Sequence, residues 1–201
     1  MLLSIAVSFL LKSNSNNEAL IIKQIKNFEN YITENKNKLI EIIYILQHQE
    51  TKEIELLKEK ISQQNLKLKI KFIYGGVQGV AHSRNIAIKE ANGNFLLFFD
   101  IDCKFKKDIT NFLNLLDKMK DNKKYLYFAN KTNYKGETIS FFPTIDKIPN
   151  CPKILKNFAF AFIAVIKSPT YNIIVDPNFC RINNLYFDTN LGLGSYYKQS
   201  D

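Results

Sequence analysis

The stretch that decides the fold class runs from Tyr74 to Phe105 of this 201-residue chain and reads YGGVQGVAHSRNIAIKEANGNFLLFFDIDCKF. Its glycine-rich start predicts a turn, and the residues that follow predict a helix over about 80–91 that stops at Gly93. The largely apolar residues 94–99 then predict a buried strand. A buried strand that follows a helix in this way is typical of a parallel α/β sheet.

Strand and helix patterns alternate in the same way before this stretch. Apolar runs over residues 3–10 and 39–46 predict two buried parallel strands. Helical spacing of apolar residues over 17–34 and 51–64 predicts a helix after each of them. Apolar residues that alternate with lysines over 66–74 predict a third strand, with one solvated face and a place near the sheet edge. These units favour a mostly parallel sheet with right-handed crossovers and helices on its faces.

The second half of the chain is less regular. Residues 109–119 predict an amphipathic helix and residues 125–129 a short strand, whereas prolines interrupt residues 132–153, where we expect a loop or a hairpin. A strong strand pattern returns at 158–166. The length favours a single domain over residues 1–201, of α/β class, with a Rossmann-like sheet and an irregular mixed second half.

The composition limits the classes of partner and compartment. Lys and Arg number 28 against 19 Asp and Glu, which gives a net charge of +9. The two arginines are Arg84 and Arg181, so the excess is lysine, which we interpret as solvated surface and not as a specific nucleic-acid interface. Peripheral contact with an anionic membrane surface stays open.

No apolar run reaches the roughly 20 residues of a membrane span. The separated Cys103, Cys151 and Cys180 fit neither a disulfide framework nor a zinc site and suit the cytoplasm, or the inner face of the membrane.

Two aspartates follow the strand predicted over 94–99. Ligands of open α/β sheets bind at the carboxyl ends of the strands, and Asp100 and Asp102 lie at such an end. Two carboxylates one residue apart suit a hard divalent cation, Mn²⁺ or Mg²⁺, which takes oxygen ligands and shares its shell with phosphate groups. The same pattern by itself is also typical of a turn or a helix cap, so its meaning depends on the residues before it.

The residues before the strand supply that context. From Gly79 to Asp102 the chain follows the pattern G-x-x-x-S-R-N-x-A-I-x-x-A-x-G-x-x-L-x-F-x-D-x-D. This pattern resembles the nucleotide-sugar half of the GT-A fold glycosyltransferases of family 2. The resemblance implies a nucleotide-sugar-binding half at 1–102 and an acceptor-side half at 103–201. It also implies a metal-dependent, inverting transferase that moves a sugar from a nucleotide diphosphate donor to the hydroxyl of a saccharide or lipid-linked acceptor, in surface polysaccharide or glycolipid assembly.

The resemblance also implies roles for individual residues. Asp102 would hold the Mn²⁺ or Mg²⁺ on the donor diphosphate, and Asp100 would contact the ribose or the metal shell. Arg84 and Asn85 would belong to the donor-binding set. For Arg84 a second interpretation is equally open, in which its guanidinium anchors the helix to the acidic strand end through an ion pair.

A second part of the resemblance lies at the carboxyl terminus. Phe187 and Asp188, and then Gly192 and Gly194, are similar to a family segment that leads to an acidic catalytic base, and Asp201 falls at about that position. The alternative is a plain surface turn followed by a frayed terminus. The chain stops where relatives continue, so a carboxyl-terminal truncation is also open.

One departure from the family pattern leaves the activity open. After the second strand the family usually has Asp residues that read the nucleobase, whereas this chain has Gln47, His48 and Gln49. The second hypothesis is therefore a non-catalytic, glycosyltransferase-like binding module. A sugar nucleotidyltransferase ranks third, because the segment after the first strand lacks the glycine-rich phosphate loop that such enzymes need.

Overall fold

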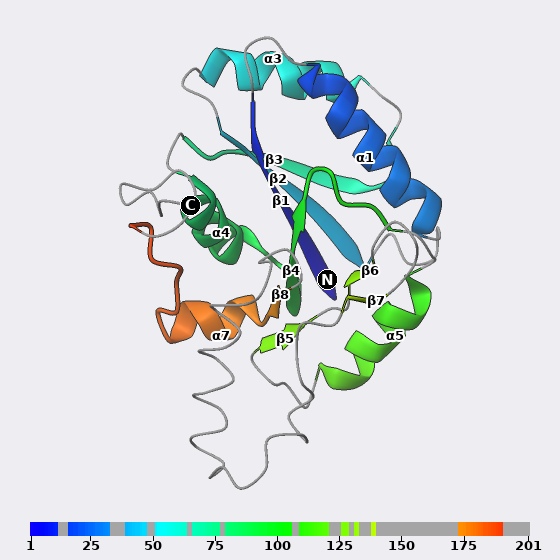
Figure 1. Ribbon diagram of the computed structural model, residues 1–201, viewed down its shortest axis with the longest axis vertical. Helices are drawn as coiled ribbons and strands as arrows, with labels where there is room; N and C mark the ends of the chain where they lie inside the picture. Colours follow the sequence, from blue (N-terminus) through cyan, green and yellow to red (C-terminus); the bar gives the residue numbers. More distant parts are fainter. Residues whose placement is uncertain are drawn as a thin grey trace, which may run out of the picture.

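A computed structural model describes residues 1–11, 16–32, 39–47, 51–63, 66–76, 79–105, 109–120, 126–128, 131–132, 138–139 and 173–190. Its main feature is a six-stranded sheet in the order β3-β2-β1-β4-β8-β5 (Figure 1). The strands are β1 (Leu3–Leu10), β2 (Ile40–Gln47), β3 (Lys69–Tyr74), β4 (Phe95–Asp100), β5 (Leu126–Phe128) and β8 (Ile173–Val175). The predicted α/β class with a mostly parallel sheet is confirmed.

The register of the parallel strands brings their carboxyl ends together. Strands β1 to β4 run parallel, with β1 between β2 and β4, and Ser8 pairs with Asp100 while Leu10 pairs with Gln47. Asp100 and Gln47 therefore lie on the same side of the sheet, at the carboxyl ends of β4 and β2. Strand β3 lies at the edge of the sheet, as its alternating lysines predict.

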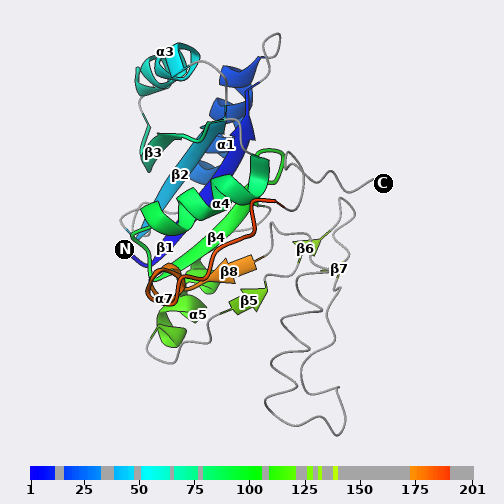
Figure 2. The ribbon, with the colours of Figure 1, turned by 90° about the vertical axis from the view of Figure 1, so that its left-hand side faces the viewer.

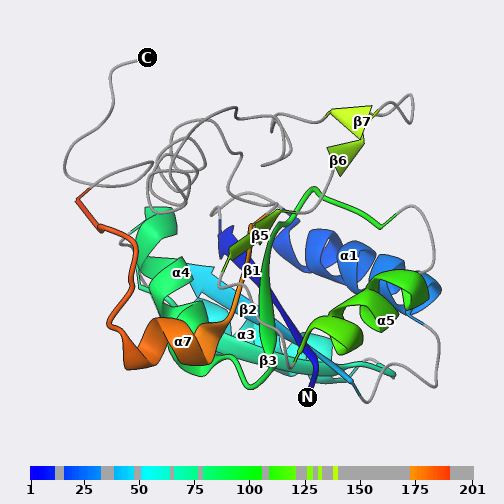
Figure 3. The same ribbon diagram turned by 90° about the horizontal axis from the view of Figure 1, so that it is seen from below.

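Helices cover both faces of the sheet (Figures 2 and 3). One apolar core joins the β1 side chains Leu3, Ile5 and Val7 to helices α1, α3 and α5. A smaller core on the other face joins Ala6 and the β4 residue Phe98 to α4 and α7. The helices are α1 (Asn17–Tyr31), α3 (Thr51–Ser62), α4 (Gly79–Glu90), α5 (Thr110–Met119) and α7 (Pro177–Ile182).

Burial on both faces explains why β2 is almost continuously apolar. Every residue of this strand is buried, and its Tyr44 is among the largest fully buried side chains. Each large apolar side chain removed from water contributes about 1.5 to 3 kcal/mol, so strands covered on both sides need apolar residues at consecutive positions. The sequence predictions for β1, β2 and their helices follow from this pattern and are confirmed.

The mixed second half is also confirmed, although its details differ from the prediction. Strand β8 lies between β4 and β5 and runs antiparallel to both, and neither β8 nor α7 was predicted. Strands β6 (Lys131–Thr132) and β7 (Thr138–Ile139) pair antiparallel, which agrees with the hairpin that was one of the two structures expected from residue 132 onward. The strand predicted over 158–166 lies outside the described residues. Among the helices described, none combines the length and apolar character needed to cross a membrane.

Buried polar groups join the amino ends of β1, β2 and β4. The Ser4 hydroxyl donates to Glu41 Oε1 at 2.6 Å and accepts from the Gly93 N–H at 2.8 Å. Glu41 also accepts from the backbone N–H of Asn92 at 2.6 Å. Burial by itself raises the pKa of Glu41, but the hydrogen bonds from Ser4 and Asn92, together with nearby Lys69, outweigh it and lower that pKa. The carboxylate is therefore a stable acceptor at neutral pH.

We expect Gly93→Ala to destabilise the fold by about 3 kcal/mol, because an added Cβ overpacks the site and breaks a buried hydrogen bond. A Cβ at Gly93 would lie 2.6 Å from Ser4 N and 2.7 Å from Ser4 Oγ. Urea unfolding measures the loss. Gly76→Ala is the control, since Gly76 has open space but a φ of +63°, and it should cost only about 1 kcal/mol. Equal losses at the two glycines would contradict the steric account.

Candidate functional site

A tight turn follows β4 and brings three possible ligand side chains together. The Cys103 N–H donates to the carbonyl oxygen of Asp100 at 3.0 Å, which closes a four-residue turn. The ligand atoms of Asp100, Asp102 and Cys103 all lie within 4.8 Å of one another. Asp100 and Cys103 are half-buried, whereas Asp102 is exposed. The turn therefore offers a cluster with one face open to a ligand.

The chemistry of this cluster fits a hard divalent cation at its two carboxylates. Mn²⁺ and Mg²⁺ take oxygen ligands, and a site made of one or two carboxylates leaves other positions for water and phosphate. The thiol of Cys103 is a softer donor beside the pair. The sequence predicted both aspartates, but not Cys103. The signal for Cys103 was its position directly after Asp102.

The segment after the turn is fixed to α1. The Asn27 side chain donates to the Phe105 carbonyl at 3.2 Å and accepts from the Phe105 N–H at 2.9 Å. The Phe105 ring packs 5.4 Å from Phe28 and 5.1 Å from Phe99, between ring centroids. Polar and aromatic contacts thus hold the chain on both sides of the carboxylates.

Arg84 lies in α4 on the other face of the sheet, close to the acidic strand end. Its guanidinium carbon is 5.8 Å from the ring centroid of Phe98 and 5.4 Å from that of Phe187. Burial lowers the pKa of Arg84 to about 10, and the charge of Asp100 acts in the opposite direction. The side chain is therefore cationic at neutral pH, and its attraction to Asp100 agrees with the anchoring interpretation. The donor contact of Arg84 stays a prediction.

Asn85 holds a distant segment of backbone. Its Nδ2 donates to the Phe187 carbonyl at 2.9 Å, and its Oδ1 accepts from the Phe187 N–H at 2.8 Å. This pair of bonds ties α4 to a residue 102 positions later in the chain. The observed partner of Asn85 is thus the protein itself, and its predicted contact with the donor stays a prediction.

The carboxyl-terminal residues of the predicted site are described only in part. Asp188 is exposed, and its Oδ1 accepts from the Asn190 N–H at 2.9 Å, as in an Asx turn. Gly192, Gly194 and the predicted base Asp201 lie outside the described residues.

Gln47 has a structural partner at the end of β2. Its Nε2 donates to the Gly79 carbonyl at 2.9 Å, and 4% of the residue is exposed. A Cβ on Gly75 would lie 2.7 Å from Ile45 Cγ2 and 3.3 Å from Gln47 Cγ, so the chain must be glycine where it passes this strand end. Gln47 thus fixes the start of α4 where the family pattern has an Asp. His48 and Gln49 lie outside the described residues.

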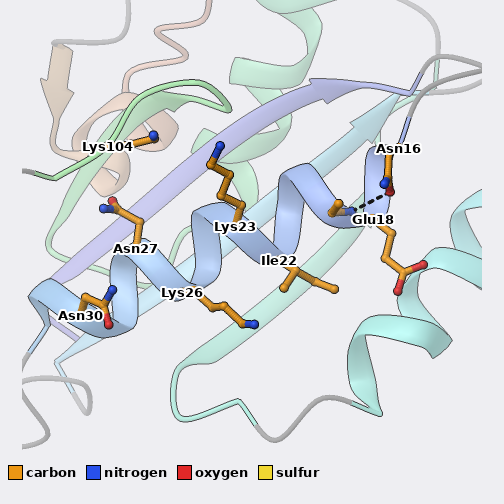
Figure 4. A pocket seen from close by; sticks show the side chains of 9 residues that line it. Asn16, Glu18, Ile22, Lys23, Lys26, Asn27, Asn30 and Lys104 are labelled. Atoms are coloured by element: carbon orange, nitrogen blue, oxygen red, sulfur yellow. Dashed lines mark hydrogen bonds between the residues drawn. The ribbon is translucent and has the colours of Figure 1, made fainter. Parts of the chain in front are cut away.

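A groove of about 680 Å³ runs along the outer surface of α1 (Figure 4). Three lysines contribute to its lining, Lys23, Lys26 and Lys104, with Glu18 as the acidic member. Neither Asp100 nor Asp102 lines this groove, so it is separate from the carboxylate cluster.

The arrangement of the sheet and of its carboxylate turn defines a GT-A type fold, and solved structures agree. TarS 1–349 of S. aureus in complex with UDP-GlcNAc superposes with a TM-score of 0.59 at 19% identity, covering 94% of this chain and 49% of that one. The mannosyltransferase PcManGT of Pyrobaculum calidifontis, in complex with GDP-Man and Mn²⁺, gives 0.59 at 12% identity, covering 96% and 49%. GalNAc-T7 with UDP, GalNAc and Mn²⁺ gives 0.56 at 10% identity, covering 97% and 39%.

The family follows from the sequence match. The model of the family described as glycosyl transferase family 2 matches residues 15–181, and the chain therefore belongs to this family. The match extends well beyond Asp102, into the half for which the sequence patterns were irregular. The chain spans about half the length of the TarS 1–349 and PcManGT chains. No curated protein matches the chain.

Proposed function

We propose that this protein is a metal-dependent, inverting glycosyltransferase that moves a sugar from a nucleoside diphosphate donor to an acceptor hydroxyl. The observation that carries the proposal is the pair Asp100 and Asp102 at the carboxyl end of β4, with ligand atoms within 4.8 Å, in a family 2 chain. The structures of PcManGT, in complex with GDP-Man and Mn²⁺, and of GalNAc-T7, with UDP, GalNAc and Mn²⁺, support the same class of ligand here.

Asp100 and Asp102 are the residues that would hold Mn²⁺ or Mg²⁺. Such an ion, when bound, stabilises the negative charge that develops on the leaving diphosphate. The exposed Asp102 would face the ligand, whereas the half-buried Asp100 lies within the electrostatic influence of Arg84. As a cation close to Asp100, Arg84 favours an anionic donor at this end of the strands.

Inversion requires a base on the acceptor side of the sugar. In the proposed reaction, a carboxylate removes the proton of the acceptor hydroxyl as its oxygen attacks the anomeric carbon from the face opposite the leaving diphosphate. Asp201 is the residue proposed for this role, on the family resemblance of the segment that begins at Phe187. The contact of Asn85 with Phe187 supports a fixed start for that segment.

The acceptor and the place of the reaction are proposed from the family resemblance and the charge. A saccharide or lipid-linked acceptor, in surface polysaccharide or glycolipid assembly, suits the family. The net charge of +9 and the lysines of the α1 groove support peripheral contact with an anionic membrane surface at its inner face.

The second candidate function is a glycosyltransferase-like module that binds without catalysis. The amide of Gln47 favours it, because this side chain already donates to the Gly79 carbonyl where the family pattern has an Asp that reads the base. A module of this kind would bind a nucleoside diphosphate but release none from a sugar nucleotide.

We expect UDP or GDP together with Mn²⁺ to raise the melting temperature by about 5 to 10 °C. A ligand at a hundred times its dissociation constant stabilises the native state by about 2.7 kcal/mol, and each kcal/mol shifts the melting temperature by about 2 to 4 °C at this chain length. Differential scanning fluorimetry measures the shift, with EDTA in place of Mn²⁺ as control. No shift with either nucleotide in the presence of Mn²⁺ would contradict the proposed function.

A further inference from the structure

The carboxylate turn rests on one buried amide from α1. Gln24 is 3% exposed, and its Nε2 lies 2.8 Å from the Asp100 carbonyl oxygen and 3.0 Å from that of Ile101. A longer contact of 3.4 Å reaches the Cys103 carbonyl oxygen. These carbonyls belong to residues before and after Asp102 in the chain, 76 to 79 positions away from Gln24. One side chain therefore links the backbone on both sides of the ligand-bearing residue.

A buried phenol fixes the orientation of that amide. Carbonyl oxygens only accept hydrogen bonds, so the amide nitrogen of Gln24 must face them and Oε1 must point away. Oε1 accepts from the Tyr44 hydroxyl at 2.9 Å. Tyr44 is fully buried in β2, and burial raises the pKa of its phenol, which keeps it a neutral donor. Its ring is stacked on Phe72, with 5.5 Å between centroids. The orientation of Gln24 is thus held from the core of the sheet.

The Gln24 amide offsets the repulsion between carbonyl oxygens that lie close together in the turn. The oxygens of Asp100, Ile101 and Cys103 all point toward one small region, where their negative dipole ends repel one another. Two amide hydrogens placed between them replace this repulsion with attraction. If the amide were lost, the oxygens would separate or turn toward water. Rotation of those peptides moves the Cα atoms that carry the carboxylates of Asp100 and Asp102.

We propose that Gln24, oriented by Tyr44, is a positioning residue that sets the separation of the Asp100 and Asp102 carboxylates for a divalent cation and a diphosphate. The inference rests on the proposed function for its ligand. In this role Gln24 contacts the backbone of the turn and not the cation or the diphosphate. Outer partners that orient ligand residues typically change metal affinity by about 10- to 100-fold when they are removed.

The variants separate positioning from general stability. Gln24→Met keeps the length and volume of the side chain but removes its hydrogen bonds. Tyr44→Phe is the milder variant, because it removes the orienting bond and leaves the amide in place. The double variant also removes the unpaired phenol that Gln24→Met leaves buried, so it should recover part of the lost stability. Ser4→Ala is the matched control, since it breaks buried hydrogen bonds at the opposite end of β1.

The experiment measures Mn²⁺ binding by electron paramagnetic resonance, with UDP and with GDP. We expect about 10- to 100-fold weaker Mn²⁺ binding in Gln24→Met, a smaller loss in Tyr44→Phe, and no change in Ser4→Ala. The double variant should bind Mn²⁺ as weakly as Gln24→Met despite its recovered stability. The inference would be overturned if Gln24→Met bound Mn²⁺ as tightly as Ser4→Ala does. It would also be overturned if the double variant recovered both its stability and its affinity for Mn²⁺.

A ligand-free measurement keeps this result separate from the proposed function. Hydrogen exchange of the peptide that contains Cys103 reports the turn directly, because the Cys103 N–H donates to the Asp100 carbonyl. Gln24→Met should speed this exchange, and Ser4→Ala should not. Equal exchange in both variants would overturn the positioning of the turn. Failure of the unmodified protein to bind Mn²⁺ with either nucleotide would instead contradict the proposed function, and with it the role of Gln24 at a cation site.

Discussion

Asp102→Asn should lower sugar transfer by roughly 10³-fold while the protein remains folded. The exposed carboxylate contributes a negative charge to the proposed cation site, and a bound cation stabilises the transition state by several kcal/mol, about 4 kcal/mol for a loss of this size. The substitution keeps the size of the side chain, and Asp102 lies at the surface, so the core is not disturbed. A radiolabel or coupled assay of transfer, run with Mn²⁺, measures the loss.

A matched control separates the site from a general effect of charge. Asp117→Asn removes an exposed carboxylate from α5, where Asp117 pairs with Lys120 at 3.1 Å on the surface. This variant should keep both transfer and the thermal shift with Mn²⁺ and a nucleoside diphosphate. Asp102→Asn should lose both. If Asp102→Asn transferred sugar as fast as Asp117→Asn, Asp102 would have no role in the reaction.

Asp201→Asn should lower transfer by about 10²- to 10⁴-fold, because a positioned general base contributes a factor of this size. Binding of the donor and of Mn²⁺ should be unchanged, since the proposed cation site lies at the end of β4. Isothermal titration with UDP or GDP and Mn²⁺ measures the binding, and a transfer assay measures the rate. The two readouts together separate a base from a donor ligand.

Ser200→Ala is the control for this second prediction, because it changes the neighbouring residue and leaves the carboxylate in place. We expect it to transfer sugar at the normal rate. If Asp201→Asn also transfers at the normal rate, another group removes the acceptor proton. If the unmodified chain binds donor but transfers nothing, the binding-module hypothesis gains support.

The parallel part of the sheet was predictable because its buried strands and helices have apolar residues at regular local spacings. Strands β1 and β2 are covered on both faces, so their sequences are almost continuously apolar, and the helices that follow them, α1 and α3, show helical spacing. Strand β8 could not be found in this way. It has three residues, too few for a period, and it is a strand because it pairs with β4 and β5 from far along the chain.

The carboxylate pair of the site was predictable, but its supports were not. Asp100 and Asp102 follow a recognisable strand, and strand ends of a parallel sheet form the ligand-binding edge. Gln24 looks like an ordinary polar residue of an amphipathic helix, since its partners lie 76 or more residues away. Asn85 was predicted from its motif. Its contact with Phe187 was not, because the two residues are 102 positions apart and a local sequence pattern does not indicate such a contact.

The departure at Gln47 also has a physical reason that the sequence alone did not show. Its amide donates to the Gly79 carbonyl, a bond that a carboxylate would not make. Gln47 therefore secures the glycine-rich turn before α4. The nitrogen of the Gln47 amide is thus bound to the protein's own backbone.

Release of nucleoside diphosphate from sugar nucleotides tests the central claim most directly. UDP-GlcNAc and GDP-Man are incubated with the full chain, with Mn²⁺ or with EDTA, and with Asp102→Asn as the blank. With no acceptor added, water takes the place of the acceptor hydroxyl, so each turnover yields the free sugar and UDP or GDP. A metal-dependent transferase predicts that the unmodified protein carries out this hydrolysis with Mn²⁺ and that it is lost with EDTA and with Asp102→Asn. Release that continues unchanged in EDTA, or that Asp102→Asn supports as well as the unmodified protein, would contradict a metal-dependent transferase built on these carboxylates.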